Sequence, residues 1–173
     1  PVTQVGSGSG SDSSGIPSFT YGNARNITIP KSVTTISDYA FQGSSTTNSQ
    51  IKSVKFAKGS QLTTIGNYAL RYCTQMTSFT IPDTVTSIGS NAFDGCSGLT
   101  GDIIIPQRVT NIATYTFSST HITSITIPSS VKSIASYAFN NCSQLETIYY
   151  GGTSDGEWNR ITIGASNDSL TSD

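Results

Sequence analysis

The sequence has little charge, and neither sign dominates. Lys and Arg number 9 and Asp and Glu 10 among 173 residues, which gives a formal net charge of −1. Domains that bind nucleic acid or anionic membranes carry a basic face, so we expect neither kind of partner. Long apolar runs are also missing, since no stretch approaches the ~20 residues that a membrane helix needs. We therefore expect no membrane insertion by this segment.

Residues that carry chemistry are scarce as well. The chain has 3 Cys, 1 Trp, 1 Met and 1 His. An odd number of cysteines argues against a complete set of disulfides, and no CxxC pair is present to hold zinc. The single histidine, His121, is expected in an exposed turn, and no motif supplies a nucleophile and an orienting carboxylate for it. We expect no catalytic residues, no metal and no cofactor, and hence no enzyme.

What the sequence does contain is a tandem repeat. The stretch SFTIPDTVTSIGSNAFDGCSGLT (78–100) returns 46 residues later as SITIPSSVKSIASYAFNNCSQLE (124–146), identical at 13 of 23 positions. One isoleucine marks each copy, namely Ile36, Ile65, Ile88, Ile112 and Ile134, at intervals of 29, 23, 24 and 22 residues. We assign the excess of the first interval to a polar surface loop, Ser44–Gln50. A period in this range indicates a solenoid, in which each unit buries its apolar face against its neighbours.

Each coil is expected to contain a strand, a return and a turn. The spacing of Met76, Phe79 and Ile81 before Pro82 predicts a short strand with alternate residues inward, ended by the proline. The Ala92–Phe93 pair predicts one helical or 3₁₀ turn that fills the coil. The predicted fold class is a β-rich solenoid of about 23-residue coils, about five in number, with parallel strands on one face.

The repeat resembles the BspA-type branch of leucine-rich repeats, whose motif runs roughly L-x-x-I-x-I-P-x-x-V-T-S-I-G-x-x-A-F-x-x-C. The resemblance covers about Asn26 to Gly164, with Leu70 in place of the Phe and Thr116 in place of the Ala. It implies a right-handed superhelix belonging to a secreted or cell-surface protein. It also implies binding to a protein, on a host or neighbouring cell, for adhesion, and no conserved catalytic residues.

The chain divides into four predicted segments. These are a flexible linker with a degenerate N-terminal cover (1–25), the repeat array (26–148), a C-terminal capping segment (149–164) and a polar tail (165–173). Within the capping segment, Ser154 and Glu157 are spaced as a capping box that opens a helical turn. Trp158 is expected to close the open end of the core, and the alternative is an aromatic platform for a ligand. We expect the protein to be a monomer.

The three cysteines share one repeat position. Cys73, Cys96 and Cys142 each follow the core Leu or Phe by three residues, so we expect a column of buried thiols. A bridge between Cys73 and Cys96 is the alternative, but parallel side chains in adjacent coils would strain its dihedral angle. The carboxylates Asp38, Asp83 and Asp94 are expected at repeated surface positions, with no converging acid–base pair.

The candidate ligand face follows from the strand pattern and the resemblance. One outward residue lies between the two inward apolar residues of each strand: Thr28, Lys55, Thr80, Ile104, Thr126 and Tyr149. Leucine-rich repeats use this face for ligands, which favours protein binding. A structural spacer or stalk displaying another domain is the alternative. Binding of ordered water or sugars by a threonine ladder is less consistent with the column, because other residue types interrupt it.

Overall fold

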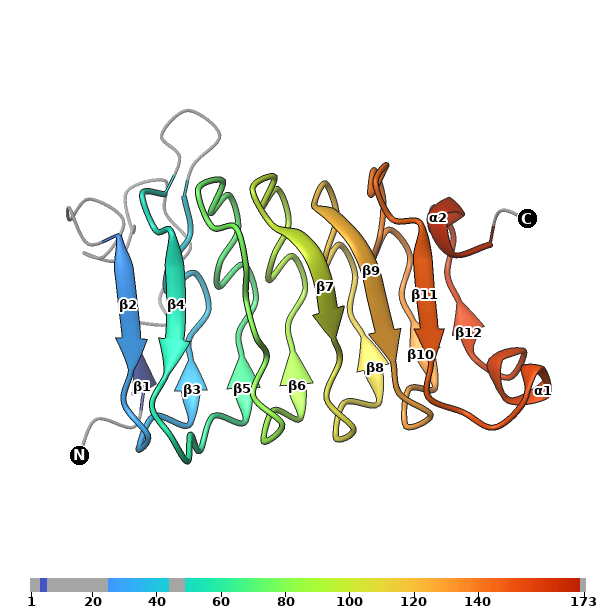
Figure 1. The fold of residues 1–173 in the computed structure, drawn as a ribbon, viewed down its shortest axis with the longest axis horizontal. Helices are drawn as coiled ribbons and strands as arrows, with labels where there is room; N and C mark the ends of the chain where they lie inside the picture. The colour runs from blue at the N-terminus through green and yellow to red at the C-terminus, as the bar shows by residue number, and fades with distance from the viewer. Residues whose placement is uncertain (1–3, 6–24, 44–48, 172–173) are drawn as a thin grey trace.

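The computed structural model describes residues 4–5, 25–43 and 49–171. The Gly/Ser-rich part of the predicted linker (6–15), the predicted N-terminal cover (16–23) and most of the Ser44–Gln50 loop lie outside these residues. The described chain winds as a solenoid from β1 at one end to α2 at the other (Figure 1). The predicted fold class is confirmed.

Two sets of parallel strands run along the solenoid, on opposite sides of its core (Figure 1). The longer set, here the front strands, comprises β2 (Asn26–Ile29), β4 (Ser53–Phe56), β7 (Thr100–Ile104), β9 (His121–Ile127) and β11 (Thr147–Tyr150). The back strands have two residues each: β1 (Gln4–Val5), β3 (Thr35–Ile36), β5 (Thr64–Ile65), β6 (Ser87–Ile88), β8 (Asn111–Ile112), β10 (Ser133–Ile134) and β12 (Thr162–Ile163). We name the coils first to sixth by their front segments, β2, β4, Ser78–Ile81, β7, β9 and β11. The back strands occupy the stretch that was predicted as a return, so strands lie on two faces and not on one.

A third ladder of hydrogen bonds joins the coils through their turns. Asn91 N–H donates to the Thr114 carbonyl (3.0 Å) and Phe93 N–H to the Thr116 carbonyl (2.9 Å) of the next coil. The turn predicted at Ala92–Phe93 is present, since the N–H groups of Ala92 and Asp94 donate to carbonyls three residues earlier. It does not form a helical or 3₁₀ segment, because the N–H groups that alternate with them donate to the next coil. We call this set of bonds the turn ladder.

The turn ladder requires a left-handed backbone at a recurring position in each coil, and the second to fifth coils have a second such position four residues later. Tyr39, Tyr68, Tyr115 and Tyr137 occupy the first position with φ between 56° and 64°, and Asn91 occupies it with φ 57°. This region costs an L-residue roughly 1–2 kcal/mol. The tyrosine rings stack in pairs, Tyr39 on Tyr68 (4.9 Å between centroids) and Tyr115 on Tyr137 (4.8 Å). Such a pair contributes about 0.5–1.5 kcal/mol, which offsets part of the strain.

The core is a column of aromatic rings between the two sets of strands. Phe79, Phe93, Phe117 and Phe139 follow one another with centroid distances of 4.9, 5.3 and 5.5 Å. Three of them, Phe93, Phe117 and Phe139, are completely buried. The column therefore runs through the third, fourth and fifth coils without a gap, and it binds those coils into one apolar body.

The six-residue excess of the first interval has two locations. Phe56 and Ile65 are nine positions apart, whereas the equivalent Ile81 and Ile88 are seven apart, so two extra residues lie in the turn that contains Gly59. Gly59 has φ 76°, in the region that favours glycine. Assigning the whole excess to the Ser44–Gln50 loop was therefore wrong. Ser49, within that loop, is buried and is not on the surface.

The third coil interrupts both sets of strands. Its front segment, Ser78–Ile81, is assigned to no strand, so β2 pairs with β4 on one side of it, and β7, β9 and β11 pair on the other. Among the described residues, no backbone hydrogen bond joins Ser78–Ile81 to either neighbour. The back strands divide one step later, between β6 and β8. The turn ladder is continuous across both interruptions.

Candidate functional site

The six residues predicted to face a ligand all belong to front segments. The strand pairing places Thr28 beside Lys55, and it places Ile104, Thr126 and Tyr149 side by side. We call the whole set, which also includes Thr80 in the third coil, the strand-face column. Thr126 is half-buried and the other members are exposed.

Two members of this column are large apolar side chains in contact with solvent. Ile104 is 63% exposed and Tyr149 is 58% exposed. Tyr149 therefore does not pack under the C-terminal cap. Burying a solvent-exposed apolar side chain of this size is the usual source of energy at a protein interface.

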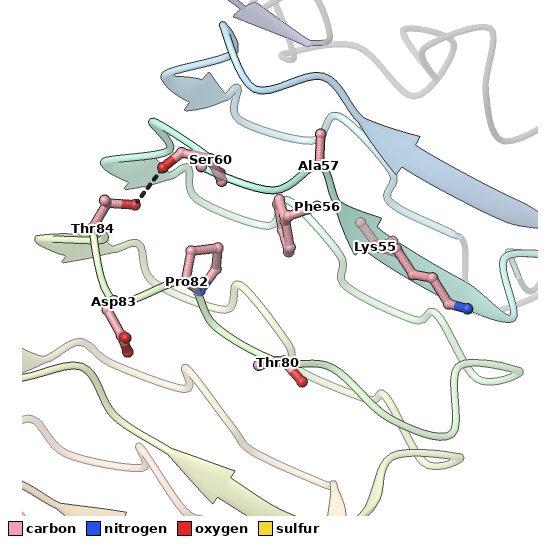
Figure 2. Close-up of a pocket in the computed structure, with 10 residues that line it drawn as sticks. Lys55, Phe56, Ala57, Ser60, Thr80, Pro82, Asp83 and Thr84 are labelled. Atoms are coloured by element: carbon pink, nitrogen blue, oxygen red, sulfur yellow. Dashed lines mark hydrogen bonds between the residues drawn. The ribbon is translucent and has the colours of Figure 1, made fainter.

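A hollow of about 540 Å³ opens beside the column, between β4 and residues 80–84 (Figure 2). Phe56 and Pro82 form its apolar lining, and Lys55 and Asp83 lie at its margins. Two features explain the hollow, because together they separate the second and third coils. These are the two extra residues before Ile65 and the absence of backbone hydrogen bonds between β4 and the front segment of the third coil. A single bond crosses its far end, from the Thr84 hydroxyl to the Ser60 carbonyl (3.5 Å).

The chemistry of this site suits binding. An apolar lining with a cation and a carboxylate at its margins can take a side chain or a short segment of a protein ligand. The lone histidine, His121, lies elsewhere, as the first residue of β9 and not in a turn as predicted. Its backbone N–H donates to the Leu99 carbonyl (3.1 Å). Within residues 4–5, 25–43 and 49–171, no cluster of His, Cys, Asp and Glu could hold a metal ion.

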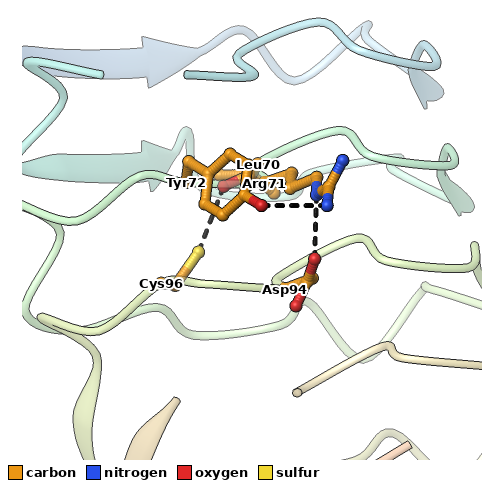
Figure 3. Close-up of polar contacts among 5 residues, drawn as sticks. All are labelled: Leu70, Arg71, Tyr72, Asp94 and Cys96. Carbon is orange, nitrogen blue, oxygen red and sulfur yellow. Dashed lines mark hydrogen bonds and ion pairs between the residues drawn. The ribbon is translucent and has the colours of Figure 1, made fainter. Parts of the chain in front are cut away.

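One partly buried ion pair stabilises the turn side of the second and third coils. Arg71 Nε donates to Asp94 Oδ2 at 2.8 Å, and the guanidinium lies over the Tyr72 ring at 4.5 Å (Figure 3). Asp94 is only 9% exposed, so the expectation that it lies on the surface is wrong. The sequence carried no signal for the pair, because Arg71 has no counterpart in the other coils.

The three cysteines form the predicted column of buried, free thiols. Each thiol donates to a carbonyl oxygen of the preceding coil: Cys73 to Phe41 (3.3 Å), Cys96 to Leu70 (3.1 Å; Figure 3) and Cys142 to Phe117 (3.1 Å). Burial raises the pKa of Cys96 well above its ordinary value, and it also raises the pKa of Cys142. Both groups are therefore held as neutral thiols.

We expect the thiols to be unreactive in the native protein. The nucleophile is the thiolate, and burial suppresses both its formation and the access of a reagent. An aromatic disulfide reagent should therefore label none of Cys73, Cys96 and Cys142 rapidly at neutral pH, and it should label all three in denaturant. Rapid native labelling of more than one, or an intact mass two units low, would contradict the observed column.

The C-terminal segment covers the core in part. Trp158 ends α1 (Asp155–Trp158) and packs edge-on against Tyr150, with ring centroids 5.4 Å apart. The capping box is not formed, because Ser154 makes no side-chain cap bond and Glu157 Oε2 instead accepts from Thr153 N–H (2.7 Å). A hollow of about 500 Å³ remains between Trp158 and β11. The prediction that Trp158 closes this end is therefore only partly correct.

The residue that ends the turn ladder was not predicted from the sequence. Asn167 is buried; its Oδ1 accepts from Phe139 N–H (2.9 Å), and its amide donates to the carbonyls of Ala135 (3.0 Å) and Gly164 (2.8 Å). It lies in the segment predicted as a polar tail, which also contains α2 (Asp168–Thr171). A signal was present, because Asn167 follows Ile163 by four residues, as Ala138 follows Ile134.

Several solved structures are similar to the chain. A leucine rich cell surface protein from Faecalibacterium prausnitzii is 21% identical, with a TM-score of 0.39, over 79% of this chain and 62% of that one. A leucine-rich repeat protein from Eubacterium ventriosum is 28% identical, with a TM-score of 0.46, over 62% of this chain and 33% of that one. A third, from Bacteroides ovatus, is 19% identical, with a TM-score of 0.29, over 83% and 61% of the respective chains. The chain thus spans less than two thirds of each of these proteins.

No curated protein matches the sequence. The family described as BspA type leucine rich repeat region matches residues 63–155 in six copies. This stretch is more than half of the chain, and its core isoleucines and phenylalanines are those that the structure buries in register. The chain therefore belongs to the BspA-type leucine-rich repeat family.

Proposed function

We propose that this chain is a non-enzymatic binding module of a secreted or surface-exposed protein, and that it binds a protein ligand through the strand-face column for adhesion. Leucine-rich repeat domains commonly serve as protein-interaction modules, and the BspA-type branch is typical of surface proteins. In the part of the chain that the structure describes, no helix is long and apolar enough to cross a membrane.

One observation carries the proposal. Among the described residues, three large hydrophobic side chains are exposed, and two of them, Ile104 and Tyr149, belong to the strand-face column. Thr126 separates them in the ladder, so they lie two strand spacings apart, which is roughly 10 Å. Two apolar anchors at this separation fit one segment of a protein ligand, and the hollow beside Lys55 extends the surface toward the first coil. A spacer would not need exposed anchors on one face.

The test is a matched pair of double variants. Binding partners are first sought on an array of extracellular proteins, and Ile104→Ser with Tyr149→Ser should then weaken binding by at least about tenfold, since hot-spot truncations cost more than about 1–2 kcal/mol. Both side chains are exposed, so the melting temperature should change little. The control, Asn111→Ser with Thr162→Ser, alters exposed residues of the back strands and should bind normally.

Three results would contradict the proposal. These are an array without any binder, equal losses from the two double variants, and binding lost only together with the folded state. The last would show that the strand-face column acts through stability and does not contact the ligand.

A further inference from the structure

The hollow between Trp158 and β11 combines aromatic rings with a carboxylate, and we call it the C-terminal hollow. Its apolar wall is formed by Ile148, Tyr150, Trp158 and Leu170, and its polar wall by Gly152, Thr153, Ser154 and Asp155. Its volume of about 500 Å³ lies within the usual range of sites for small molecules. Among the described residues that line it, Asp155 supplies the one charged side chain.

Two aromatic rings form adjacent walls of this hollow. The rings of Tyr150 and Trp158 lie 5.4 Å apart between centroids and at an angle of 69°, so one ring turns its edge toward the face of the other. The ring that contributes its edge therefore keeps both of its faces clear of its neighbour. Both side chains are half-buried and packed against the core, which limits their motion. The two rings thus enclose a corner that offers a π-face to a ligand.

The turn after β11 holds the Tyr150 ring in place. Gly152 lies so close to this ring that a Cβ there would collide with its Cε1 atom. Glu157 Oε2 accepts from Thr153 N–H (2.7 Å), and a Cβ at position 152 would meet this oxygen as well. The glycine and the carboxylate therefore fix the turn against the ring. The corner is formed before a ligand binds, so little binding energy is lost in ordering it.

The chain around the C-terminal hollow is acidic. Residues 146–171 contain four acids and one base, namely Glu146, Asp155, Glu157, Asp168 and Arg160. The base, Arg160, lines a separate hollow of about 110 Å³ together with Lys132 and Glu157. A carboxylate and an aromatic π-face both attract a cation, and the attraction to the ring grows as the cation loses water. The lining of the C-terminal hollow therefore suits a positively charged ligand.

The apolar part of the wall selects the kind of cation. A primary ammonium carries N–H donors, which lose their hydrogen bonds to water when they lie against carbon. A quaternary ammonium has no N–H group, and burial of its methyl groups against Ile148 and Leu170 is favourable. A phosphate beside the ammonium would be repelled by Asp155 and the acids around it. The chemistry that fits is therefore a quaternary ammonium with no anionic group nearby.

We propose that the C-terminal hollow binds a small quaternary ammonium compound of the choline type. The methylated nitrogen lies in the corner between Tyr150 and Trp158, and the carboxylate of Asp155 balances its charge. Each contact of a cation with a ring strengthens binding by about twofold to thirtyfold. With two rings and one carboxylate we expect a dissociation constant in the millimolar range. This site is independent of the protein ligand proposed for the strand-face column.

The fluorescence of the single tryptophan provides the test. The chain contains 1 Trp, so emission excited beyond the absorption of tyrosine comes from Trp158 alone. Choline chloride, replacing sodium chloride at constant ionic strength, should change this emission in a saturable way. Two analogues should bind at least about tenfold more weakly, namely ethanolamine, which is a primary ammonium, and dimethylbutanol, in which carbon replaces the nitrogen. Phosphocholine, the head group of a lipid source, should bind at least about threefold more weakly, because its phosphate is repelled.

Two variants and a matched control locate the site. Asp155→Asn should raise the dissociation constant for choline about threefold, and Tyr150→Leu should raise it at least about fivefold. Asp83→Asn makes the same change in charge at an exposed position of the third coil and should bind choline as wild type does. Circular dichroism checks that each variant is folded. Because the side chain of Asp155 is exposed, Asp155→Asn keeps its fold even if Tyr150→Leu does not.

Four results would each overturn the proposal. The first is an emission that choline does not change in a saturable way. The second is binding of dimethylbutanol or ethanolamine as tight as that of choline, which would show that the methylated cation is not what the hollow selects. The third is binding of phosphocholine as tight as that of choline, which would assign the hollow to a lipid head group. The fourth is an equal loss of affinity from Asp155→Asn and Asp83→Asn.

Discussion

Replacing Phe93 with alanine is expected to lower the free energy of unfolding by about 3–5 kcal/mol, the usual cost of truncating a buried phenylalanine. Phe93 is fully buried between Phe79 and Phe117, with ring centroids at 4.9 and 5.3 Å. Its loss breaks the aromatic column in the third coil, where the front and back ladders are interrupted. The space cannot be closed by strand movement alone, since the turn ladder holds the coil in place.

Urea unfolding followed by circular dichroism measures this change. Thr86→Ala is the matched control, because Thr86 is exposed and loses only one hydroxyl contact, to the Thr63 carbonyl (3.2 Å). Its unfolding midpoint should lie close to that of wild type. A Phe93→Ala midpoint no lower than that of Thr86→Ala would show that the repeat frame is wrong.

Asn167→Ala is expected to lower the free energy of unfolding by roughly 3 kcal/mol, because each buried group left unsatisfied costs about 1–3 kcal/mol. The asparagine side chain replaces the carbonyl that a further coil would supply to Phe139 N–H, and it satisfies two carbonyls as well. Alanine fills too little space to exclude water completely. We therefore expect part of the cost to be recovered by hydration of the groups nearest the surface.

Thermal melts of Asn167→Ala and Asn159→Ala provide the comparison. The side chain of Asn159 is exposed, and the bond from its backbone N–H to the Asp155 carbonyl (3.0 Å) is retained by alanine. Hydrogen exchange at Phe139 N–H should accelerate only in the Asn167 variant. Unchanged exchange at that amide would show that Asn167 does not end the turn ladder.

The repeat made the coil spacing, the buried isoleucines and the buried thiols predictable. A residue that recurs every coil sits in the same environment every time, so Ile65 and Ile88 could be assigned together from their positions alone. The strand-face column was predictable for the same reason. Its exposed anchors could be named as Ile104 and Tyr149, although their role in binding stays a prediction.

The remaining features depend on residues that occur once. Arg71 reaches Asp94 only because the second coil carries an arginine there, and the hollow beside Lys55 exists because two residues were added near Gly59. The back strands were not predicted for a different reason, since two residues are too few to show the alternation of apolar and polar residues that indicates a strand. The positive φ of the tyrosines could not be predicted either, because a bulky residue rarely adopts this conformation and the usual sequence signal for it is glycine.

The uneven bonding between coils sets where the molecule would yield under load. Between the third and fourth coils, the backbone bonds among described residues are those of the turn ladder and one from Thr100 to Thr77. The neighbouring junctions keep a front or a back ladder in addition. A pulling force along the long axis is therefore resisted at this junction by the bonds along one edge of the coil and by the contact between the rings of Phe93 and Phe117. We expect the third and fourth coils to separate first, starting at the front and back sides, where no strand pairing joins them. The coils on either side of the break should remain folded.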